Sequence, residues 1–471
     1  MNPSADLVNR LWRLCSLLRK DGITYQQYVT ELSQLLFLKM MHEFGAEKTL
    51  PAGSRWSDLL GIPNADKLRA YRGALHVLGR SRDVPTVIGR IFAKSSTAIR
   101  EPDNLAKLIM QIDSIGWLSE SRNSFGDLYE GILERNAEEA KRGAGQYFTP
   151  RVLVDVIVDL LQPVEGEVVQ DPAAGTGGFL TAADRYARTT AGPCRASGME
   201  NVPETYRLLL MNLYLHGIDT GDVLLGDTLS DNWRGLPPAD VILTNPPFGP
   251  AGGRPSRSDL TVTGTVSSFA PPFVEHCVRS LKAGGRAAIV VPDSILNEEG
   301  RSRALRTFLM SECELHTVLR LPSGIFYAQN VRTNVLFLNR RADGAGTSAV
   351  WFYDLRADMP AFGKSTPLAI RHFDEFARFY GGEPNGSDRP ADGASDDRRA
   401  RRVTRDEIGA NDDDLDYSCL REGDEAAEDA ANEPQEMLAA AQGYLSQAQA
   451  HLQALVDELD RYEDKSTGDD V

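Results

Sequence analysis

The chain lacks long hydrophobic runs, paired cysteines and histidines at the spacing of metal ligands. No stretch of about 18 apolar residues occurs, and residues 1–9 contain no apolar core of a secretory signal. The five cysteines are odd in number and far apart, which excludes a disulfide framework and a CxxC metal pair. We therefore expect a cytoplasmic protein that uses neither a membrane nor a bound metal.

The chain also lacks a basic excess. Its formal net charge is −16, but residues 381–471 carry 25 acidic and 9 basic side chains, whereas residues 1–380 carry 42 of each. A neutral body does not repel DNA as a whole, and it offers no basic groove of its own. If the protein acts on DNA, we expect a partner to supply much of the phosphate binding.

The two common nucleotide-binding fingerprints are missing from the glycine-rich segment. Residues 168–170 form a short strand pattern that ends in residues 171–179, Asp-Pro-Ala-Ala-Gly-Thr-Gly-Gly-Phe, before a helix. The third glycine of GxGxxG would fall on Leu180, and no GK[ST] follows here. A strand, a glycine-rich turn and a helix nevertheless form the arrangement that holds a ligand over a helix N-terminus.

Polar side chains also end the next two strand patterns. Residues 196–199 run into Glu200, where a carboxylate can accept hydrogen bonds from both hydroxyl groups of a ribose. Residues 223–226 run into Asp227, which can accept a hydrogen bond from an exocyclic adenine amine. The carboxyl ends of parallel strands meet at one edge of a sheet, so one site can gather these groups.

The fourth strand pattern, residues 241–244, leads into Asn245-Pro246-Pro247-Phe248. The two prolines hold φ near about −65° and donate no backbone hydrogen bond, so the loop is rigid. Asn245 offers a side-chain carbonyl, Pro246 offers a backbone carbonyl and Phe248 offers a flat ring. These groups match a planar aromatic amine, with one acceptor for each N–H group and a ring for stacking.

A helix start precedes all of these segments. Thr149-Pro150 predicts a helix with Thr149 as the N-cap and Pro150 as the first helical residue, followed by an amphipathic pattern. The aromatic residues just before this start favour a ligand or a core contact over a surface loop. The segment before the cap consists of Gln146, Tyr147 and Phe148.

Changes of periodicity divide the chain into domains. Residues 1–140 show helical periodicity, whereas residues 141–382 alternate strands with helices, which favours an α/β fold with a doubly wound, mostly parallel sheet. Residues 383–433 are acidic and poor in apolar side chains, so we expect a flexible connector. Leucine and alanine recur at coiled-coil spacing in residues 434–465, which predicts a helix for subunit assembly.

Two groups of arginines suit phosphate contacts. Arg254 and Arg257 lie in a long polar loop between Phe248 and Phe269. The connector contains Arg398, Arg399, Arg401, Arg402 and Arg405. Clusters of charged side chains are more often exposed to solvent than engaged with a ligand, so we interpret both groups of arginines as solvated.

Together these motifs resemble the DNA-modification (methyltransferase) subunit of type I restriction–modification enzymes, in the adenine-N6 class. The resemblance covers nearly the whole chain, with the segment at residues 146–151, the segment at residues 171–179 and the segment at residues 245–249 in the family's order. It implies the sheet of S-adenosylmethionine-dependent methyltransferases, an α-helical N-terminal domain and a C-terminal helical tail. The long acidic connector departs from the family's pattern.

The resemblance also implies roles for individual residues. S-adenosylmethionine would lie over the glycine-rich segment, with Glu200 on its ribose and Asp227 near its adenine. The cofactor-binding set that this implies is Gln146, Tyr147, Phe148, Thr149, Pro150, Arg151, Asp171, Gly175, Thr176, Gly177, Gly178, Glu200 and Asp227. The catalytic set is Asn245, Pro246, Pro247 and Phe248, which would hold an adenine flipped out of double-stranded DNA.

The family further implies partners. A separate specificity subunit would read the DNA, with two copies of this chain per specificity subunit, and a restriction (nuclease) subunit would join for cleavage. Three alternatives stay open at this point: a cytosine-N4 methyltransferase, a protein-glutamine methyltransferase and an inactive cofactor-binding assembly subunit. Pro193-Cys194 matches the nucleophile pair of cytosine-C5 methylases, but it precedes a strand pattern, so we do not interpret Cys194 as a nucleophile.

Overall fold

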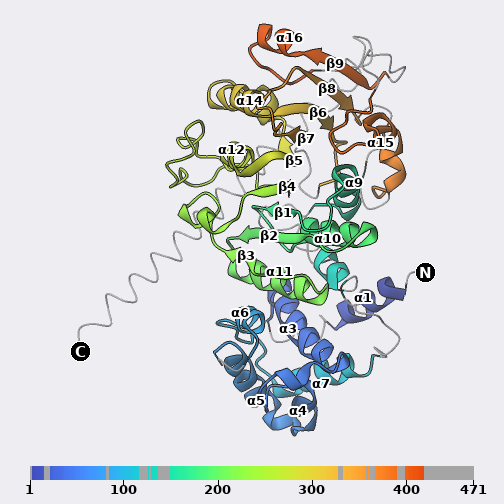
Figure 1. The fold of residues 1–471 in the computed structure, drawn as a ribbon. Helices are drawn as coiled ribbons and strands as arrows, with labels where there is room; N and C mark the ends of the chain where they lie inside the picture. The colour runs from blue at the N-terminus through green and yellow to red at the C-terminus, as the bar shows by residue number, and fades with distance from the viewer. Residues whose placement is uncertain are drawn as a thin grey trace.

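The fold is known from a computed structural model (Figure 1). The structure describes residues 3–14, 22–80, 84–115, 126, 129–135, 149–326, 332–356, 359–360, 362, 366–389, 398–417 and 419. No helix in these ranges is long and apolar enough to cross a membrane. The predicted helix at residues 434–465 lies outside them.

The N-terminal part is helical. It contains α1 (Pro3–Arg13), α3 (Tyr25–Glu43), α4 (Trp56–Gly61), α5 (Asn64–Leu78), α6 (Thr86–Ile91) and α7 (Pro102–Asp113). A capping box starts α3, because the Thr24 side chain accepts from the backbone N–H of Gln27 and the Gln27 side chain accepts from that of Thr24. Pro102 begins α7, where a missing N–H costs nothing.

The N-terminal helices pack on α11 (Pro203–Leu215), which belongs to the following domain. The Arg90 side chain of α6 donates hydrogen bonds to the Tyr206 hydroxyl at 3.1 Å and to the Thr220 carbonyl at 3.0 Å. The rings of Phe37 and Tyr214 lie 5.4 Å apart. Figure 1 shows this helical part beyond the β3 edge of the sheet.

A nine-stranded sheet forms the centre of the molecule, in the order β3-β2-β1-β4-β5-β7-β6-β8-β9. Its strands are β1 (Val168–Asp171), β2 (Arg195–Glu200), β3 (Asp222–Leu225), β4 (Ala239–Thr244), β5 (Leu281–Pro292), β6 (Glu314–Arg320), β7 (Thr333–Asn339), β8 (Ala349–Asp354) and β9 (Ala400–Thr404). β7 is antiparallel to β5 and β6, and β9 is antiparallel to β8; the other pairs are parallel. The predicted doubly wound, mostly parallel sheet is therefore confirmed.

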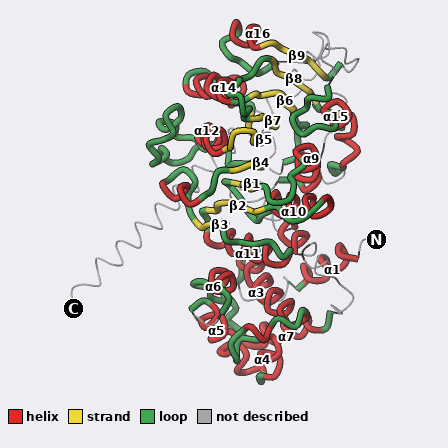
Figure 2. The backbone as a smooth tube through the Cα atoms, in the orientation of Figure 1, coloured by secondary structure: helices red, strands yellow, loops and turns green. Residues whose placement is uncertain are grey.

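Helices cover both faces of the sheet. Figures 1 and 2 show α9 (Arg151–Leu161), α10 (Gly178–Thr190) and α15 (Asp374–Tyr380) on one side, and α12 (Ala270–Ser280) and α14 (Arg301–Glu312) on the other. Short α13 (Ser294–Asn297) follows β5. Burial on both faces explains why β5 reads as a continuous apolar run, with residues 287–291 fully buried.

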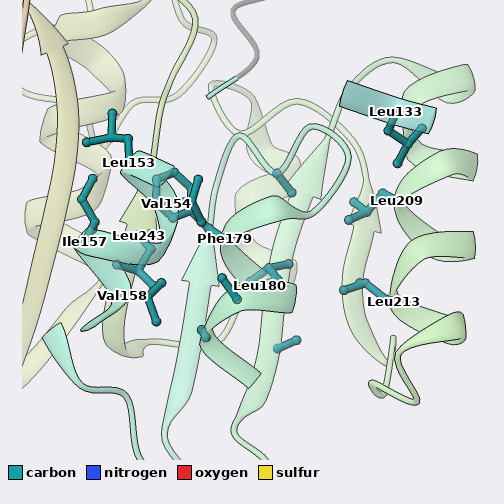
Figure 3. Close-up of a cluster of buried hydrophobic side chains, with 14 of the residues drawn as sticks. Leu133, Leu153, Val154, Ile157, Val158, Phe179, Leu180, Leu209, Leu213 and Leu243 are labelled. Carbon is teal, nitrogen blue, oxygen red and sulfur yellow. The ribbon is translucent and has the colours of Figure 1, made fainter. Parts of the chain in front are cut away.

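A cluster of apolar side chains attaches α9 and α10 to the sheet (Figure 3). Leu153 and Ile157 of α9 lie beside Leu243 of β4, and Phe179 and Leu180 of α10 extend the cluster. Each of these five side chains is at most 3% exposed. The two helices that flank the glycine-rich segment and the Asn-Pro-Pro-Phe loop therefore share one core.

The prediction of a flexible connector over residues 383–433 is wrong for its middle part. β9 pairs with β8, and α16 (Arg405–Ala410) follows with a capping box at Thr404. Val403 and Ile408 are buried, and the Arg399 side chain forms an ion pair with Glu375. Only alternate residues of an edge strand need to be apolar. Because the residues between them in β9 are arginines, the segment lacks the apolar run from which a strand is usually predicted.

Candidate functional site

Four strand ends meet at one edge of the sheet. β3, β2, β1 and β4 are neighbours in that order and run parallel, so Asp227, Glu200, Asp171 and Asn245 follow adjacent strands on the same side. A crossover connection carries the chain from each of these strands to the next, which is why the residues are distant in sequence. The structure therefore brings the predicted strand-end residues to one edge.

Two glycines shape the turn between β1 and α10. Gly175 has φ 53° and Gly177 has φ 90°, in the left-handed region that favours glycine. A Cβ atom on Gly177 would lie 2.6 Å from Leu209 Cδ1, whereas one on Gly178 would meet nothing within 4 Å. The space beside Gly178, the first residue of α10, is thus open, and the backbone N–H groups of this helix N-terminus suit a ligand with acceptor atoms.

Glu200 lies against this turn. Its carboxylate accepts hydrogen bonds from the backbone N–H of Gly175 at 3.0 Å and of Val202 at 2.8 Å. Burial raises the pKa of Glu200, and those backbone bonds oppose the rise. Because a carboxylate has about four lone-pair positions, Glu200 keeps acceptor capacity for hydroxyl groups of a ligand.

Asp227 is exposed beyond β3. Its Oδ1 accepts a hydrogen bond from the backbone N–H of Leu229 at 2.8 Å. Oδ2, the other carboxylate oxygen, takes no part in this bond. Leu225, at the end of the same strand, is 49% exposed. Sequence reasoning missed Leu225, although two successive leucines at a strand end must place one of them off the core face. Leu225 and Asp227 together offer an apolar surface beside a carboxylate.

Asp171 faces the neighbouring strand and not the open space. Its Oδ1 accepts from the Thr244 hydroxyl at 2.7 Å and from the Ala173 backbone N–H at 3.1 Å. The side chain is buried, and this burial raises the pKa of Asp171 to about 7, against the effect of both hydrogen bonds. Asp171 therefore ties the glycine-rich turn to the residue just before Asn245, and Thr244 was missed by sequence reasoning.

Asn245 has one amide atom bound and the other without a partner. Its Nδ2 donates to the Thr149 hydroxyl oxygen at 2.9 Å. Its Oδ1 is buried and has no hydrogen-bond partner among the residues that the structure describes. Pro246 is buried, and Phe248 is 7% exposed within the main core. The loop thus presents an unused acceptor beside a largely covered ring.

The predicted N-cap role of Thr149 is wrong. α9 begins at Arg151, with Pro150 as the N-cap residue and no side-chain cap. Pro150 has ψ 131°, an extended value that keeps it out of the helix, so the helix starts one residue later than predicted. The Thr149 hydroxyl is thereby available to Asn245.

Arg151 and Thr176 are also held by neighbouring side chains. Arg151 forms an ion pair with Glu130 at 2.6 Å, and Glu130 accepts a hydrogen bond from the Thr181 hydroxyl of α10 at 2.8 Å. The carbonyl of Thr176 accepts from the Asn212 side chain of α11 at 2.9 Å. Pro247 is partly buried in its loop. The predicted residues Gln146, Tyr147 and Phe148 lie outside the described residues.

The surroundings of Cys194 and Arg257 bear on two further interpretations of the sequence. Cys194 is buried, and burial raises the pKa of its thiol to about 12, which opposes formation of a thiolate nucleophile. The Arg257 side chain is fully buried, pairs with Asp259 at 2.5 Å and donates to the Thr228 carbonyl, so its interpretation as a solvated loop charge is wrong. Among the described residues, no group of three or more potential metal ligands occurs.

A doubly wound, mostly parallel sheet with helices on both faces is the fold of S-adenosylmethionine-dependent methyltransferases. The model of the N-6 DNA methylase family matches residues 120–429. The type I restriction enzyme StySPI methylase subunit of Salmonella potsdam is 42% identical, over 96% of this chain and 95% of that one. The chain belongs to the N-6 DNA methylase family.

Solved structures are similar over the same extent. The crystal structure of the type I restriction enzyme EcoKI M protein is 38% identical, covers 96% of both chains and has a TM-score of 0.54. A chain from a study of complex assembly and conformational transition of the type I R-M system is 25% identical, with a TM-score of 0.73. That match covers 98% of this chain and 99% of the other.

The burial of Asp171 predicts a pH-dependent effect of the Asp171→Asn substitution. The variant keeps the acceptor Oδ1 but loses the charge. Because the pKa of Asp171 is raised from 3.8 to about 7, its contribution to stability is present at low pH and is lost as the pH rises through about 7. We expect the free energy of unfolding of the variant, relative to the natural chain, to increase by at least about 1 kcal/mol between about pH 5 and about pH 8.

Urea denaturation at both pH values measures this difference. Asp231→Asn, which removes an exposed carboxylate, is the control for loss of one negative charge. A relative stability of Asp171→Asn that stays constant or decreases over this range would contradict the raised pKa of Asp171.

Proposed function

We propose that the chain is the modification subunit of a type I restriction–modification complex and transfers a methyl group from S-adenosylmethionine to the N6 atom of adenine in double-stranded DNA. The family match and the 42% identical relative over 96% of the chain support the reaction class. The observation that carries the proposal is the buried Oδ1 of Asn245 after β4, which has no hydrogen-bond partner in the part of the chain that the structure describes.

The residues at the sheet edge fit S-adenosylmethionine. The open space at Gly178 suits the cofactor's close approach to the α10 N-terminus, and Glu200 retains lone pairs for its ribose hydroxyls. Leu225 and Asp227 offer an apolar surface and a carboxylate for its adenine. When bound, the cofactor supplies an electrophilic methyl group. Asp171 acts in this proposal by shaping the turn and not by direct contact.

Asn245 and Pro246 would act on the amine of the target base. That amine is a poor nucleophile, because its lone pair is delocalised into the ring. Asn245 Oδ1 and the Pro246 carbonyl would accept its two hydrogens and favour a tetrahedral nitrogen whose lone pair is directed at the methyl group. The target must leave the duplex, which costs roughly a few kcal/mol. Phe248 is only 7% exposed, so base stacking on it requires its covering residues to move aside.

The alternatives are less well supported. Cytosine-N4 and glutamine side-chain amines have the same two N–H donors, so Asn245 alone does not discriminate among them. The match to the N-6 DNA methylase family favours adenine. An inactive assembly subunit has no need for an unpartnered buried acceptor, which costs about 1–3 kcal/mol.

We expect Asn245→Ala to lower the rate of methyl transfer by at least about 100-fold. The substitution removes the acceptor of a hydrogen bond that becomes stronger in the transition state. Binding of S-adenosylmethionine, measured by calorimetry, is expected to be unchanged. The rate is measured as labelled methyl transfer to duplex DNA by the chain assembled with its specificity subunit. Asn64→Ala, in the N-terminal helices, is the control. Transfer by Asn245→Ala at the natural rate would contradict the assignment.

Thr149 has a positioning role in this proposal and is not a cofactor ligand. Its hydroxyl is the hydrogen-bond partner of Asn245 Nδ2, and it is not used to cap α9. By holding Nδ2, Thr149 leaves Oδ1 as the amide atom that can accept from a substrate amine. The bond also ties the start of α9 to the end of β4, two segments that are 96 residues apart.

Thr149→Val and Thr149→Ser separate this role from cofactor binding. Valine removes the hydroxyl at nearly the same volume, and we expect kcat to fall about tenfold, the effect of one lost hydrogen bond. Serine retains the hydroxyl, so Thr149→Ser should keep kcat near the natural value. The dissociation constant of S-adenosylmethionine should be unchanged in both. A Thr149→Val variant that weakens cofactor binding at unchanged kcat would show that Thr149 is a cofactor ligand.

Partners follow from the charge distribution and from the relatives. The body of the chain is electrically neutral, with 42 acidic and 42 basic side chains in residues 1–380, so DNA reading falls to another subunit. The curated relatives are named as methylase subunits of type I restriction enzymes. We propose that two copies of this chain join one specificity subunit in the cytoplasm, that residues 434–465 form the assembly helix, and that a restriction subunit binds this complex.

Truncation before Pro434 tests the assembly helix. We expect the truncated chain to lose co-purification with the specificity subunit, because the coiled-coil seam at residues 434–465 is removed. Its thermal unfolding temperature should match that of the full chain, since the sheet remains intact. Unchanged co-purification would contradict the role of this segment.

A further inference from the structure

A cavity lies away from the strand ends described above. It has a volume of about 230 Å³ and lies between the start of β6, the start of β8, β9 and the loop that follows α15. The charged and aromatic side chains that line the cavity are those of Glu314, His316, Arg341, Trp351, Arg389 and Arg402. Nothing in the proposed methyl transfer uses them.

The cavity is at the opposite edge of the sheet from Asn245. β7 is antiparallel to both β5 and β6, so β6 runs in the same direction as β5, and β8 is parallel to β6. Glu314 begins β6 and Ala349 begins β8, whereas Asp171 ends β1 and Asn245 follows the end of β4. The sheet therefore separates the cavity from the proposed methyl-transfer site.

Arg389 supplies a buried positive charge without a carboxylate partner. It is 8% exposed and forms no ion pair among the described residues. Its guanidinium donates to the Tyr380 carbonyl at 3.2 Å and lies over the Tyr380 ring, 4.7 Å from the centroid. Burial lowers the pKa of Arg389 to about 10, so the group stays charged at neutral pH. A buried charge that is not neutralised is costly, and an anion would offset that cost.

His316 adds a buried N–H donor. Arg389 Nη2 lies 3.3 Å from His316 Nδ1, and a guanidinium only donates, so Nδ1 is the acceptor. The Thr317 hydroxyl lies 2.9 Å from the same Nδ1 and can also donate to it, so a neutral ring with its hydrogen on Nε2 satisfies both contacts. The Nε2 atom is buried and has no hydrogen-bond partner in the described ranges. His316 itself is 7% exposed.

Arg402 supplies a second positive charge. It lies opposite Trp351 in the antiparallel pairing of β8 with β9, so the two side chains share a face. Arg402 is exposed and has no ion pair with any residue for which the structure gives a placement. Arg341, in contrast, is neutralised by Asp343 at 2.6 Å and approaches Glu314 at 3.8 Å. Among the described residues, neither Arg389 nor Arg402 thus forms an ion pair, although the charge of Arg402 acts on the Glu407 carboxylate.

We propose that this cavity binds a phosphate group, carried by inorganic phosphate or a small phosphomonoester. Two guanidinium groups and an N–H donor match the several acceptor oxygens of a tetrahedral oxyanion. The volume lies below the range of about 300–1,000 Å³ typical of drug-sized ligands, which favours a small molecule. DNA engaged at Asn245 lies at the other edge of the sheet. This site is independent of the proposed methyl transfer.

Calorimetric titration of the full chain with potassium phosphate, against potassium chloride at equal ionic strength, tests the proposal. We expect saturable binding of phosphate that weakens at least about tenfold in Arg402→Ala and in Arg389→Met, because each loses a charge-assisted hydrogen bond. Arg401→Ala is the matched control. Arg401 neighbours Arg402 on β9 but lies over the Tyr417 ring, 5.2 Å from its centroid, on the other face.

The outcomes separate the possibilities. Phosphate binding by the natural chain and by Arg401→Ala, with loss in Arg402→Ala, supports the site even if Arg389→Met fails to fold, since Arg402 is exposed. Absence of saturable binding, or equal binding by Arg401→Ala and Arg402→Ala, overturns it. Competition by glycerol phosphate supports a small phosphomonoester. Competition by a short DNA duplex without competition by glycerol phosphate overturns the small-ligand assignment in favour of a backbone phosphodiester.

Discussion

The parallel pairing of β1 with β4 is the constraint on which the site depends. Val169 lies opposite Val241 and Gln170 opposite Ile242, so β4 ends at Thr244, one residue beyond the end of β1. The Thr244 hydroxyl then reaches the Asp171 carboxylate at 2.7 Å. Because parallel neighbours need long crossovers, the chain between them supplies β2 and β3 and brings their acidic ends to the same edge.

A third segment completes this edge from outside the sheet. Thr149 precedes α9 and contacts Asn245, and Arg151 at the start of α9 pairs with Glu130, which also accepts from Thr181 of α10. The helix before β1, the helix after β1 and the loop after β4 are therefore linked by side-chain bonds. Movement of α9 would reach Asn245 through Thr149, whereas movement of α10 would first pass through Glu130 and Arg151. The Asn245 amide is thus coupled to α9 and α10, which lie on one face of the sheet.

The sequence predicted the strand ends because glycine and proline mark them and because apolar runs precede them. It did not predict the direction in which each side chain points. Asp171 at a strand end suits a ligand or a neighbouring strand equally well, and only the register with β4 decides between them. The position of Thr149 depended on one backbone angle, ψ of Pro150. The sequence did not predict β9, because the exposed positions of this strand are arginines. The contact between His316 and Arg389 was also not predicted, because the two residues are 73 positions apart in the sequence.

Hydrogen-bonding polarity distinguishes the two edges of the sheet. Glu200, Asp227 and Asn245 present oxygen acceptors at the carboxyl ends of the strands, which suits amines, hydroxyl groups and a sulfonium cation. Arg389 and Arg402 present donors and positive charge at the opposite edge, which suits oxyanions. Donor groups of a ligand suit the first edge and acceptor groups suit the second, and the strands of the sheet lie between the two edges. Any influence of one site on the other must therefore pass through the intervening strands, and residues 287–291 of β5 are fully buried, so that path is a close-packed one.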